Sequence, residues 1–258
     1  MKNTSDNLTD FLSKFSFRPE MAGFFGTERE HFLISSSDRS YAPKSKKFLE
    51  TIRNNMWTYE LSACQVESRT QPQIDLKAIE AGLLANKNMG DKVAIKLGLE
   101  LLNQEVADVN MPLDVYPDQR YLEIAEHISE EQLRAACQVA GTHIHIGANN
   151  IDQAITINNL LVPNLNTLCD MGDHSNGARL RLYRTMAKNW QPTIYQNPEH
   201  LFEISQKENF TDNPRNCWKL IRISIHGTVE LRMFGATNDI NEILGWISFV
   251  KSVLKKVM

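Results

Sequence analysis

Cysteine is scarce in this sequence of 258 residues, and the cysteines present are scattered. The four are Cys64, Cys137, Cys169 and Cys217. No two of them have the C-x-x-C spacing that is typical of structural zinc sites and of redox-active dithiols. We therefore expect reduced thiols in a cytoplasmic protein rather than a disulfide framework, with Cys64 and Cys137 packed in the interior.

The sequence also lacks long apolar runs and a strong excess of either charge. No stretch approaches the roughly 20 apolar residues of a membrane span, and the polar start of the chain predicts no signal peptide. Lys and Arg total 28 against 31 for Asp and Glu, a net charge of −3. This balance argues against nucleic-acid and membrane partners. Walker A and Rossmann glycine motifs are missing as well, so a glycine-rich nucleotide loop is not expected.

Apolar periodicity predicts strands mixed with long helices, without regular βαβ alternation. Helices are expected over 6–15, within 41–55, over 75–103 with a candidate break at 89–91, over 151–171 with a break at Pro163, and after Asp239 or Asn241. A capping box formed by Ser129 and Gln132 opens another helix, which Gly141 is expected to end. Strand-like runs cover 26–34, 59–70 and 142–147, and two further runs within 221–234 are joined near His226 and Gly227. The region 172–217 is expected to be irregular. This order favours an α+β fold with a largely antiparallel sheet.

One predicted strand, GTEREHFLI at residues 26–34, is rich in charge. Alternate side chains of a strand point to opposite faces, so Glu28 and Glu30 share one face and Arg29 and His31 share the other. A solvated edge strand would explain this segment by itself. A pair of carboxylates aimed at a cation would explain it equally well, and one segment does not decide between the two.

The same alternation recurs in four further runs, which place carboxylate, imidazole and guanidinium groups on one predicted face. These groups are Gln65, Glu67 and Arg69 with Glu60 just upstream, His143 and His145, Arg222, Ser224 and His226, and Glu230 and Arg232. Each run alone has an ordinary explanation, as solvated carboxylates, surface imidazoles or a surface ion pair. Their repetition predicts instead a sheet with one packed face and one chemically active face.

Five carboxylates that converge in one cavity would repel one another and raise their pKa values, and divalent cations would remove that penalty. Mg²⁺ prefers oxygen ligands, and a histidine among the ligands makes Mn²⁺ suitable too. Arginines beside such cations suit phosphate or carboxylate oxygens. The set therefore points to phosphoryl-transfer chemistry on a nucleotide that is held by metal and sheet.

Five segments, in this order, resemble the carboxylate–amine ligases of the glutamate–cysteine ligase 2 family, which belongs to the glutamine synthetase superfamily. They are GTEREHFLI, YELSACQVESRTQPQ, AGTHIHIGANN, YRTMAKNW and WKLIRISIHGTVELRMFGATNDINEILGWISFV. The resemblance implies a curved, largely antiparallel sheet that forms an active-site funnel and is flanked by helices. We expect a single catalytic domain over 1–258, in which 1–20 is an N-terminal helical extension.

The resemblance also implies two cation sites in the funnel. Glu28 and Glu30 would be paired metal glutamates, one for each cation. The first cation would add Glu60 and Glu67 as ligands, and the second, which binds the nucleotide phosphates, would add His143 and Glu230.

Further roles are implied for one histidine and four arginines. His145 would lie near the ATP phosphates, and Arg232 would stabilise the charge on the transferred phosphoryl group. Arg222 would bind phosphate or a substrate carboxylate. Arg181 and Arg184 would hold substrate.

The implied activity is that of an ATP-dependent ligase that uses Mg²⁺ or Mn²⁺. ATP would phosphorylate a carboxylate, most simply the γ-carboxylate of glutamate, and an amine such as cysteine or another amino acid would then displace phosphate to give an amide. Two alternatives remain open at this point: a regulatory protein that binds metal or nucleotide at a degenerate ligase site, and a phosphotransferase on the same fold. The expected partners are small molecules, and exposed sheet edges are compatible with a homodimer.

Overall fold

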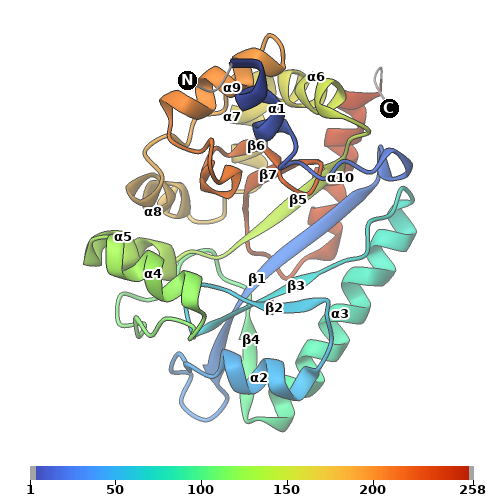
Figure 1. Cartoon of the computed structure of the whole chain (residues 1–258). Helices are drawn as coiled ribbons and strands as arrows, with labels where there is room; N and C mark the ends of the chain where they lie inside the picture. Colours follow the sequence, from blue (N-terminus) through green and yellow to red (C-terminus); the bar gives the residue numbers. More distant parts are fainter. Residues whose placement is uncertain (1–3, 256–258) are drawn as a thin grey trace.

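The computed structural model describes residues 4–255, with side chains described from residue 7 onward. A seven-stranded sheet forms its centre, and every pairing among the described strands is antiparallel. The strand order is β2-β3-β1-β5-β7-β6, and β4 pairs with β1 outside this path (Figure 1). The strands are β1 (Phe25–Ser35), β2 (Trp57–Tyr59), β3 (Gln65–Arg69), β4 (Leu99–Leu102), β5 (Gly141–Gly147), β6 (Ile221–Ser224) and β7 (Thr228–Gly235). The predicted α+β architecture with an antiparallel sheet is confirmed.

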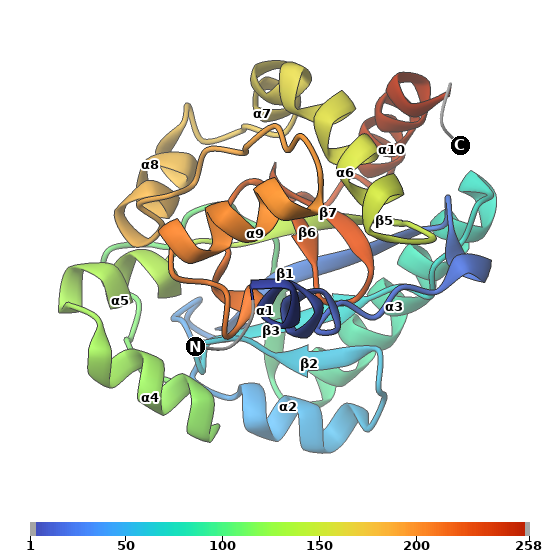
Figure 2. The same cartoon turned by 45° about the horizontal axis from the view of Figure 1, so that its top comes forward.

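Helices surround this sheet. They are α1 (Thr4–Leu12), α2 (Ser45–Ile52), α3 (Leu76–Lys96), α4 (Gln119–His127), α5 (Glu130–Cys137), α6 (Ile151–Leu161), α7 (Leu165–Met171), α8 (Ala178–Met186), α9 (Pro198–Lys207) and α10 (Ile240–Leu254), with short 3₁₀ turns at Pro19–Met21, Val162–Asn164 and Pro214–Asn216. Figure 2 shows α6, α7 and α10 gathered along one side of the sheet, and α6 and α7 contact β7. None of the described helices is both long and apolar enough to span a membrane.

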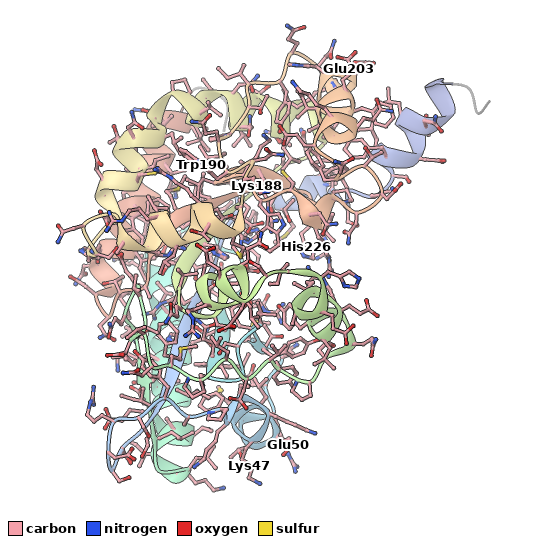
Figure 3. The ribbon with its side chains drawn as sticks, turned by 90° about the vertical axis from the view of Figure 1, so that its left-hand side faces the viewer. Lys47, Glu50, Lys188, Trp190, Glu203 and His226 are labelled. Carbon is pink, nitrogen blue, oxygen red and sulfur yellow. The ribbon has the colours of Figure 1, made fainter. Side chains whose placement is uncertain are left out.

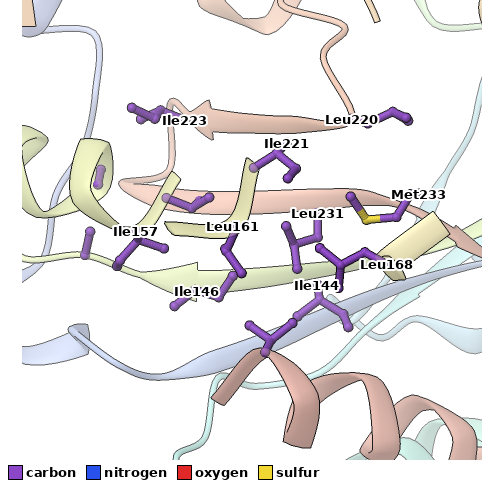
Figure 4. Close-up of a cluster of buried hydrophobic side chains, with 14 of the residues drawn as sticks. Ile144, Ile146, Ile157, Leu161, Leu168, Leu220, Ile221, Ile223, Leu231 and Met233 are labelled. Carbon is purple, nitrogen blue, oxygen red and sulfur yellow. The ribbon is translucent and has the colours of Figure 1, made fainter. Parts of the chain in front are cut away.

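The side of the sheet under α6, α7 and α10 is the packed face. Ile144 and Ile146 of β5 and Leu231 of β7 are fully buried there. Figure 4 shows them among side chains of β6, α6 and α7. Because side chains alternate along a strand, His143 and His145 of β5 must point to the opposite face. The expected division into one apolar and one polar face is confirmed for β5, β6 and β7.

Several sequence-predicted boundaries are confirmed by local hydrogen bonds. Ser129 and Gln132 form the reciprocal capping box at the start of α5, and Asp239 caps α10 by accepting from the Asn241 N–H. The predicted break at Pro163 is the 3₁₀ turn between α6 and α7. The expectation of one catalytic domain with a helical extension over 1–20 stays a prediction.

The helix predicted over 75–103 is wrong in two respects. Gly90 does not break it, because α3 is continuous, and a Cβ at Gly90 would lie 2.5 Å from the Trp57 ring. This glycine is therefore required for close packing rather than for a turn. The helix ends at Lys96 instead, where Gly98 adopts a φ of +67° that favours glycine. The residues after it form the strand β4 rather than a further helical turn.

Three other predicted elements also need correction. The run 59–70 is not one strand, because residues 60–64 form a turn between β2 and β3. Gly141 does not end α5; it is the first residue of β5. The supposedly irregular region 172–217 contains α8 and α9, whose apolar faces are interrupted by charged residues.

Candidate active site

The polar face of the sheet brings together side chains from five adjacent strands. In the observed register Glu30 of β1 lies opposite Glu67 of β3, and Glu28 lies opposite His143 of β5. Farther along the sheet, Glu230 of β7 lies between His145 on one neighbouring strand and Arg222 on the other. Residues that are distant in sequence, such as Glu28 and Glu230, therefore form one continuous cluster. We call it the funnel cluster, and its members are Glu28, Glu30, Glu67, His143, His145, Arg222, Glu230 and Arg232.

Glu28 lies at the centre of the funnel cluster. One of its carboxylate oxygens, Oε2, is 3.5 Å from His143 Nδ1 and 3.3 Å from His145 Nε2. Both of these imidazole nitrogens are buried and have no hydrogen-bond partner. His143 Nδ1 is also 3.8 Å from Glu230 Oε1. Buried polar atoms are normally paired, so unpartnered nitrogens directed at carboxylates indicate a place for a ligand.

The carboxylates and histidines form two groups that could each hold a metal ion. The first is Glu28, Glu67 and His143, and the second is Glu28, His145 and Glu230; within each group the ligand atoms lie within 4.8 Å of one another. Carboxylate oxygens with one imidazole nitrogen fit Mg²⁺ or Mn²⁺. The grouping differs from the sequence-based assignment, since His143 joins Glu67 and His145 joins Glu230. The individual ligand roles stay predictions.

Glu30 and Glu60 border the first group. Glu30 accepts a 2.6 Å hydrogen bond from the Gly141 N–H through Oε2, and its Oε1 lies 3.6 Å from His143 Nε2. Burial raises the pKa of Glu60, and the neighbouring Glu28 raises it further. Burial and the charges of Glu28 and Glu60 likewise raise the pKa of Glu67 well above its usual range. Crowded carboxylates of this kind favour binding of a cation.

The second group is held by arginines. Burial acts to raise the pKa of Glu230, but Arg222 and Arg232 together hold it well below its usual range. Arg222 donates to both carboxylate oxygens of Glu230, at 2.8 and 3.1 Å. Arg232 forms a short ion pair with the same carboxylate and also donates to the Tyr183 hydroxyl at 3.3 Å. Both arginines predicted to act in catalysis therefore lie in the funnel cluster.

Helix α8 supplies two residues that sequence reasoning missed, Arg179 and Tyr183. The buried Arg179 guanidinium donates to the carbonyl oxygens of Ala140, Met233 and Arg232, at 2.9 to 3.2 Å. It fits because a Cβ at Gly141 would lie 2.1 Å from its Nη2. The i, i+4 spacing of Arg179 and Tyr183 was the available signal, but it has meaning only if 178–186 is read as a helix.

The structure does not bring Arg181 and Arg184 to the funnel cluster. Both are exposed, and they line a separate hollow together with Trp190. The reason is helical geometry, because Arg179 and Tyr183 lie on one side of α8 and the two predicted residues project from other sides. The structure therefore does not place them with the other predicted site residues, and the expectation that they hold substrate stays a prediction.

A cavity of about 270 Å³ opens beside Glu28 and His145. Arg18, Arg69 and His226 contribute basic groups to its wall, and Met21 and Phe24 contribute apolar surface. Figure 3 labels His226, one of the residues that line this cavity. A lining that combines basic and apolar side chains next to a carboxylate–histidine group suits a ligand with both a charged and an apolar part.

Two curated relatives are similar to this chain over most of its length. A glutamate–cysteine ligase of Natronomonas pharaonis is 23% identical over 257 residues, which are 92% of this chain and 70% of the relative. A Frankia alni protein, provisionally named glutamate–cysteine ligase 2-3, is 26% identical over 238 residues, or 85% of this chain. This chain spans only 27% of the length of the Frankia protein.

Among solved structures, a bifunctional glutathione synthetase from Pasteurella multocida superposes with a TM-score of 0.56 at 11% identity, over 97% of this chain and 40% of that one. This likeness concerns the fold, a glutamine-synthetase-like antiparallel sheet flanked by helices. The family model for Glutamate-cysteine ligase family 2 (GCS2) matches residues 24–168, more than half of the chain. The matched range includes GTEREHFLI and GTHIHIG, the two strands that meet at Glu28. The chain therefore belongs to glutamate–cysteine ligase family 2.

Proposed function

We propose that this chain is an ATP-dependent carboxylate–amine ligase. The observation that carries the proposal is the position of Glu28, whose carboxylate belongs to both potential metal groups on the polar face of the sheet. A site that joins a phosphoryl group to a carboxylate must hold two anions close together, and paired cations beside arginines meet that requirement.

Two divalent cations fit the funnel cluster, because its buried imidazole nitrogens have no hydrogen-bond partner and its carboxylates repel one another. Glu28, Glu67 and His143, with Glu30 and Glu60 nearby, would hold one cation, and Glu28, His145 and Glu230 would hold the other. When bound, Mg²⁺ or Mn²⁺ would neutralise phosphate oxygens and act as a Lewis acid.

The arginines have the position that charge stabilisation requires. Arg232 is fixed by Glu230 and by the Tyr183 hydroxyl, so its guanidinium is oriented before substrate binds. Arg222 is held by the same carboxylate from the neighbouring strand. Arg232 would stabilise the transferring phosphoryl group, and Arg222 would bind phosphate or a substrate carboxylate. The cavity lined by Arg18, Arg69 and His226 would take part of the nucleotide.

The proposed reaction consumes one ATP for each amide bond. The acid attacks the γ-phosphorus of ATP, which releases ADP and leaves an acyl phosphate. An amine then attacks the acyl carbon, loses a proton and displaces inorganic phosphate. Glutamate is the first acid to test and cysteine the first amine, because two relatives bear the name glutamate–cysteine ligase.

The test measures ADP release from the purified chain with ATP, Mg²⁺ or Mn²⁺, glutamate and a panel of amines, with the products identified by mass spectrometry. The expected result is ADP formation that requires both acid and amine, together with one new amide. ATP turnover that is unaffected by omitting the acid would refute the proposal. A stable phosphorylated acceptor without an amide would indicate a phosphotransferase, and metal-dependent ATP binding without turnover would indicate a regulatory protein.

A further inference from the structure

A second hollow, of about 590 Å³, lies on the outer side of α8. Its wall comes from α7, from the loop that follows α7, from α8 and from Trp190. Figure 3 faces this side of the molecule and labels Trp190. The volume is within the range of about 300–1,000 Å³ that is usual for small-molecule sites.

Two guanidinium groups line this hollow without a carboxylate partner. Among the residues that the structure describes, Arg181 and Arg184 form no ion pair. Arg181 donates through Nη1 to the Asn176 carbonyl at 2.8 Å, which leaves its other terminal nitrogen available. The Arg184 guanidinium lies over the Trp190 ring, 4.0 Å from the ring centroid. Such stacking orients a guanidinium while its N–H groups stay free to bind an anion.

One carboxylate in the hollow is also available. Asp173 is occupied, because it accepts hydrogen bonds from the Ser175 and Gly177 N–H groups. Asp170 lines the hollow without a comparable bond among the described residues. Leu165 and Leu180 add apolar surface. The hollow thus offers two cationic groups, one anionic group and an apolar floor.

The hollow is separate from the funnel cluster. Arg179 and Tyr183 on the inner side of α8 bond to the strands and to Arg232, whereas Arg181 and Arg184 project away from that side. The inner residues are buried and the outer ones are exposed. A ligand in the hollow would therefore contact a helix that forms part of the active-site wall without entering the active site.

We propose that this hollow binds a small amino acid or peptide that carries two carboxylates and one ammonium group. The two guanidinium groups match the carboxylates, since charge-assisted pairing of Arg with carboxylate is strong and directional. Asp170 matches the ammonium group. The proposal concerns a site outside the funnel, and it holds whether or not the chain forms an amide.

Isothermal titration of the full chain with L-glutamate, in EDTA and without ATP, tests the proposal. Arg184→Gln and Arg181→Gln should each weaken binding about tenfold, the effect of losing one charge-assisted hydrogen bond. The matched control Lys188→Gln removes a nearby exposed cation that does not line the hollow, and it should bind as the parent does. The funnel variant Arg222→Gln is titrated in parallel, because L-glutamate bound at the proposed active site would respond to this variant, whereas L-glutamate bound in the hollow would respond to Arg184→Gln.

Each other outcome would overturn the proposal. Binding that is lost in Arg222→Gln but kept in Arg184→Gln would place the ligand in the funnel. Inorganic phosphate that competes as well as L-glutamate would show an unselective anion site. A lack of measurable binding at millimolar L-glutamate would show no site. Because ATP is not used, failure of ligase activity would leave all of these results interpretable.

Discussion

Histidines are buried on both faces of the sheet, but the hydrogen bonding of their ring nitrogens differs between the two faces. On the packed face, both ring nitrogens of His31 have partners: Nδ1 contacts Asn103 Oδ1, Nε2 lies 2.9 Å from Ser68 Oγ, and the ring stacks with Trp57. On the polar face, His143 Nδ1 has no hydrogen-bond partner and lies near two carboxylates. Burial alone therefore does not distinguish a structural histidine from one that awaits a ligand.

The neighbours of the two histidines explain the difference. On β1, His31 shares its face with Thr27, Arg29 and Leu33, so β1 itself contributes no carboxylate next to the ring. His143 faces Glu28 and Glu30, whose charges need compensation. An unpaired buried group lowers stability, and a fold keeps such groups where a ligand supplies the missing partner. Partnered ring nitrogens thus indicate a structural histidine, and unpartnered ring nitrogens that lie beside carboxylates indicate a site.

The largest effect is expected from Glu28→Gln. This change keeps the shape of the side chain but removes the charge that both metal groups share, so ADP release should fall about 10³-fold or more. The fold should be unchanged by circular dichroism. Glu50→Gln, an exposed carboxylate of α2 labelled in Figure 3, is the matched control and should keep the parent rate. Full activity of Glu28→Gln would contradict a metal-binding role for Glu28 and would leave GTEREHFLI with a structural role alone.

Replacing each of the two histidines by alanine gives the next largest effect. His31→Ala leaves Asn103 and Ser68 without partners and opens a cavity beside Trp57, so urea unfolding should show a loss of about 2–4 kcal/mol. His143→Ala should lose about 1 kcal/mol or less, because water can enter from the funnel. Mn²⁺ should stabilise the parent against thermal unfolding, and His143→Ala, but not His31→Ala, should reduce that stabilisation. Equal stability losses in the two variants would contradict the distinction.

The residues of the polar face were predictable from sequence because side-chain alternation has a period of two. Glu28 and Glu30, or His143 and His145, must share a face in any regular strand. The partners across strands were not predictable in the same way, because register depends on tertiary pairing. The family resemblance assigned His143 and Glu230 to the same cation, whereas the structure groups His143 with Glu28 and Glu67.

The structural role of His31 and the contacts of Arg179 on the inner side of α8 could not be predicted from the sequence, for a related reason. His31 is structural only because Asn103, which is 72 positions away, reaches its ring. Arg179 reaches the carbonyl oxygens of the strands only because Gly141 leaves space for its guanidinium. Both contacts depend on packing between segments that are far apart in the sequence, and a local pattern of residue types does not predict such packing.

The pH dependence of stability sharpens the contrast at His31. Burial lowers the pKa of His31 to about 3, whereas the unfolded chain has the ordinary value of 6.5. Below pH 6.5 the unfolded state takes up a proton that the folded state does not bind, so stability is lost as the pH falls towards 3. The slope is at most about 1.4 kcal/mol per pH unit. Urea titrations should show this extra slope in the parent and not in His31→Gln; parallel curves would contradict it.

The smallest effect is expected from Arg29→Met on the packed face. Burial lowers the pKa of Arg29 to about 10, the guanidinium donates to the Thr237 carbonyl, and its Nε has no partner. Methionine fills much of the same space without the cost of a buried charge, so the free energy of unfolding should change by about 1 kcal/mol or less. ADP release should stay within about twofold of the parent, because no funnel atom changes. A large loss of ADP release with an intact fold would show that the packed face takes part in the chemistry, and the distinction between the two faces would then fail.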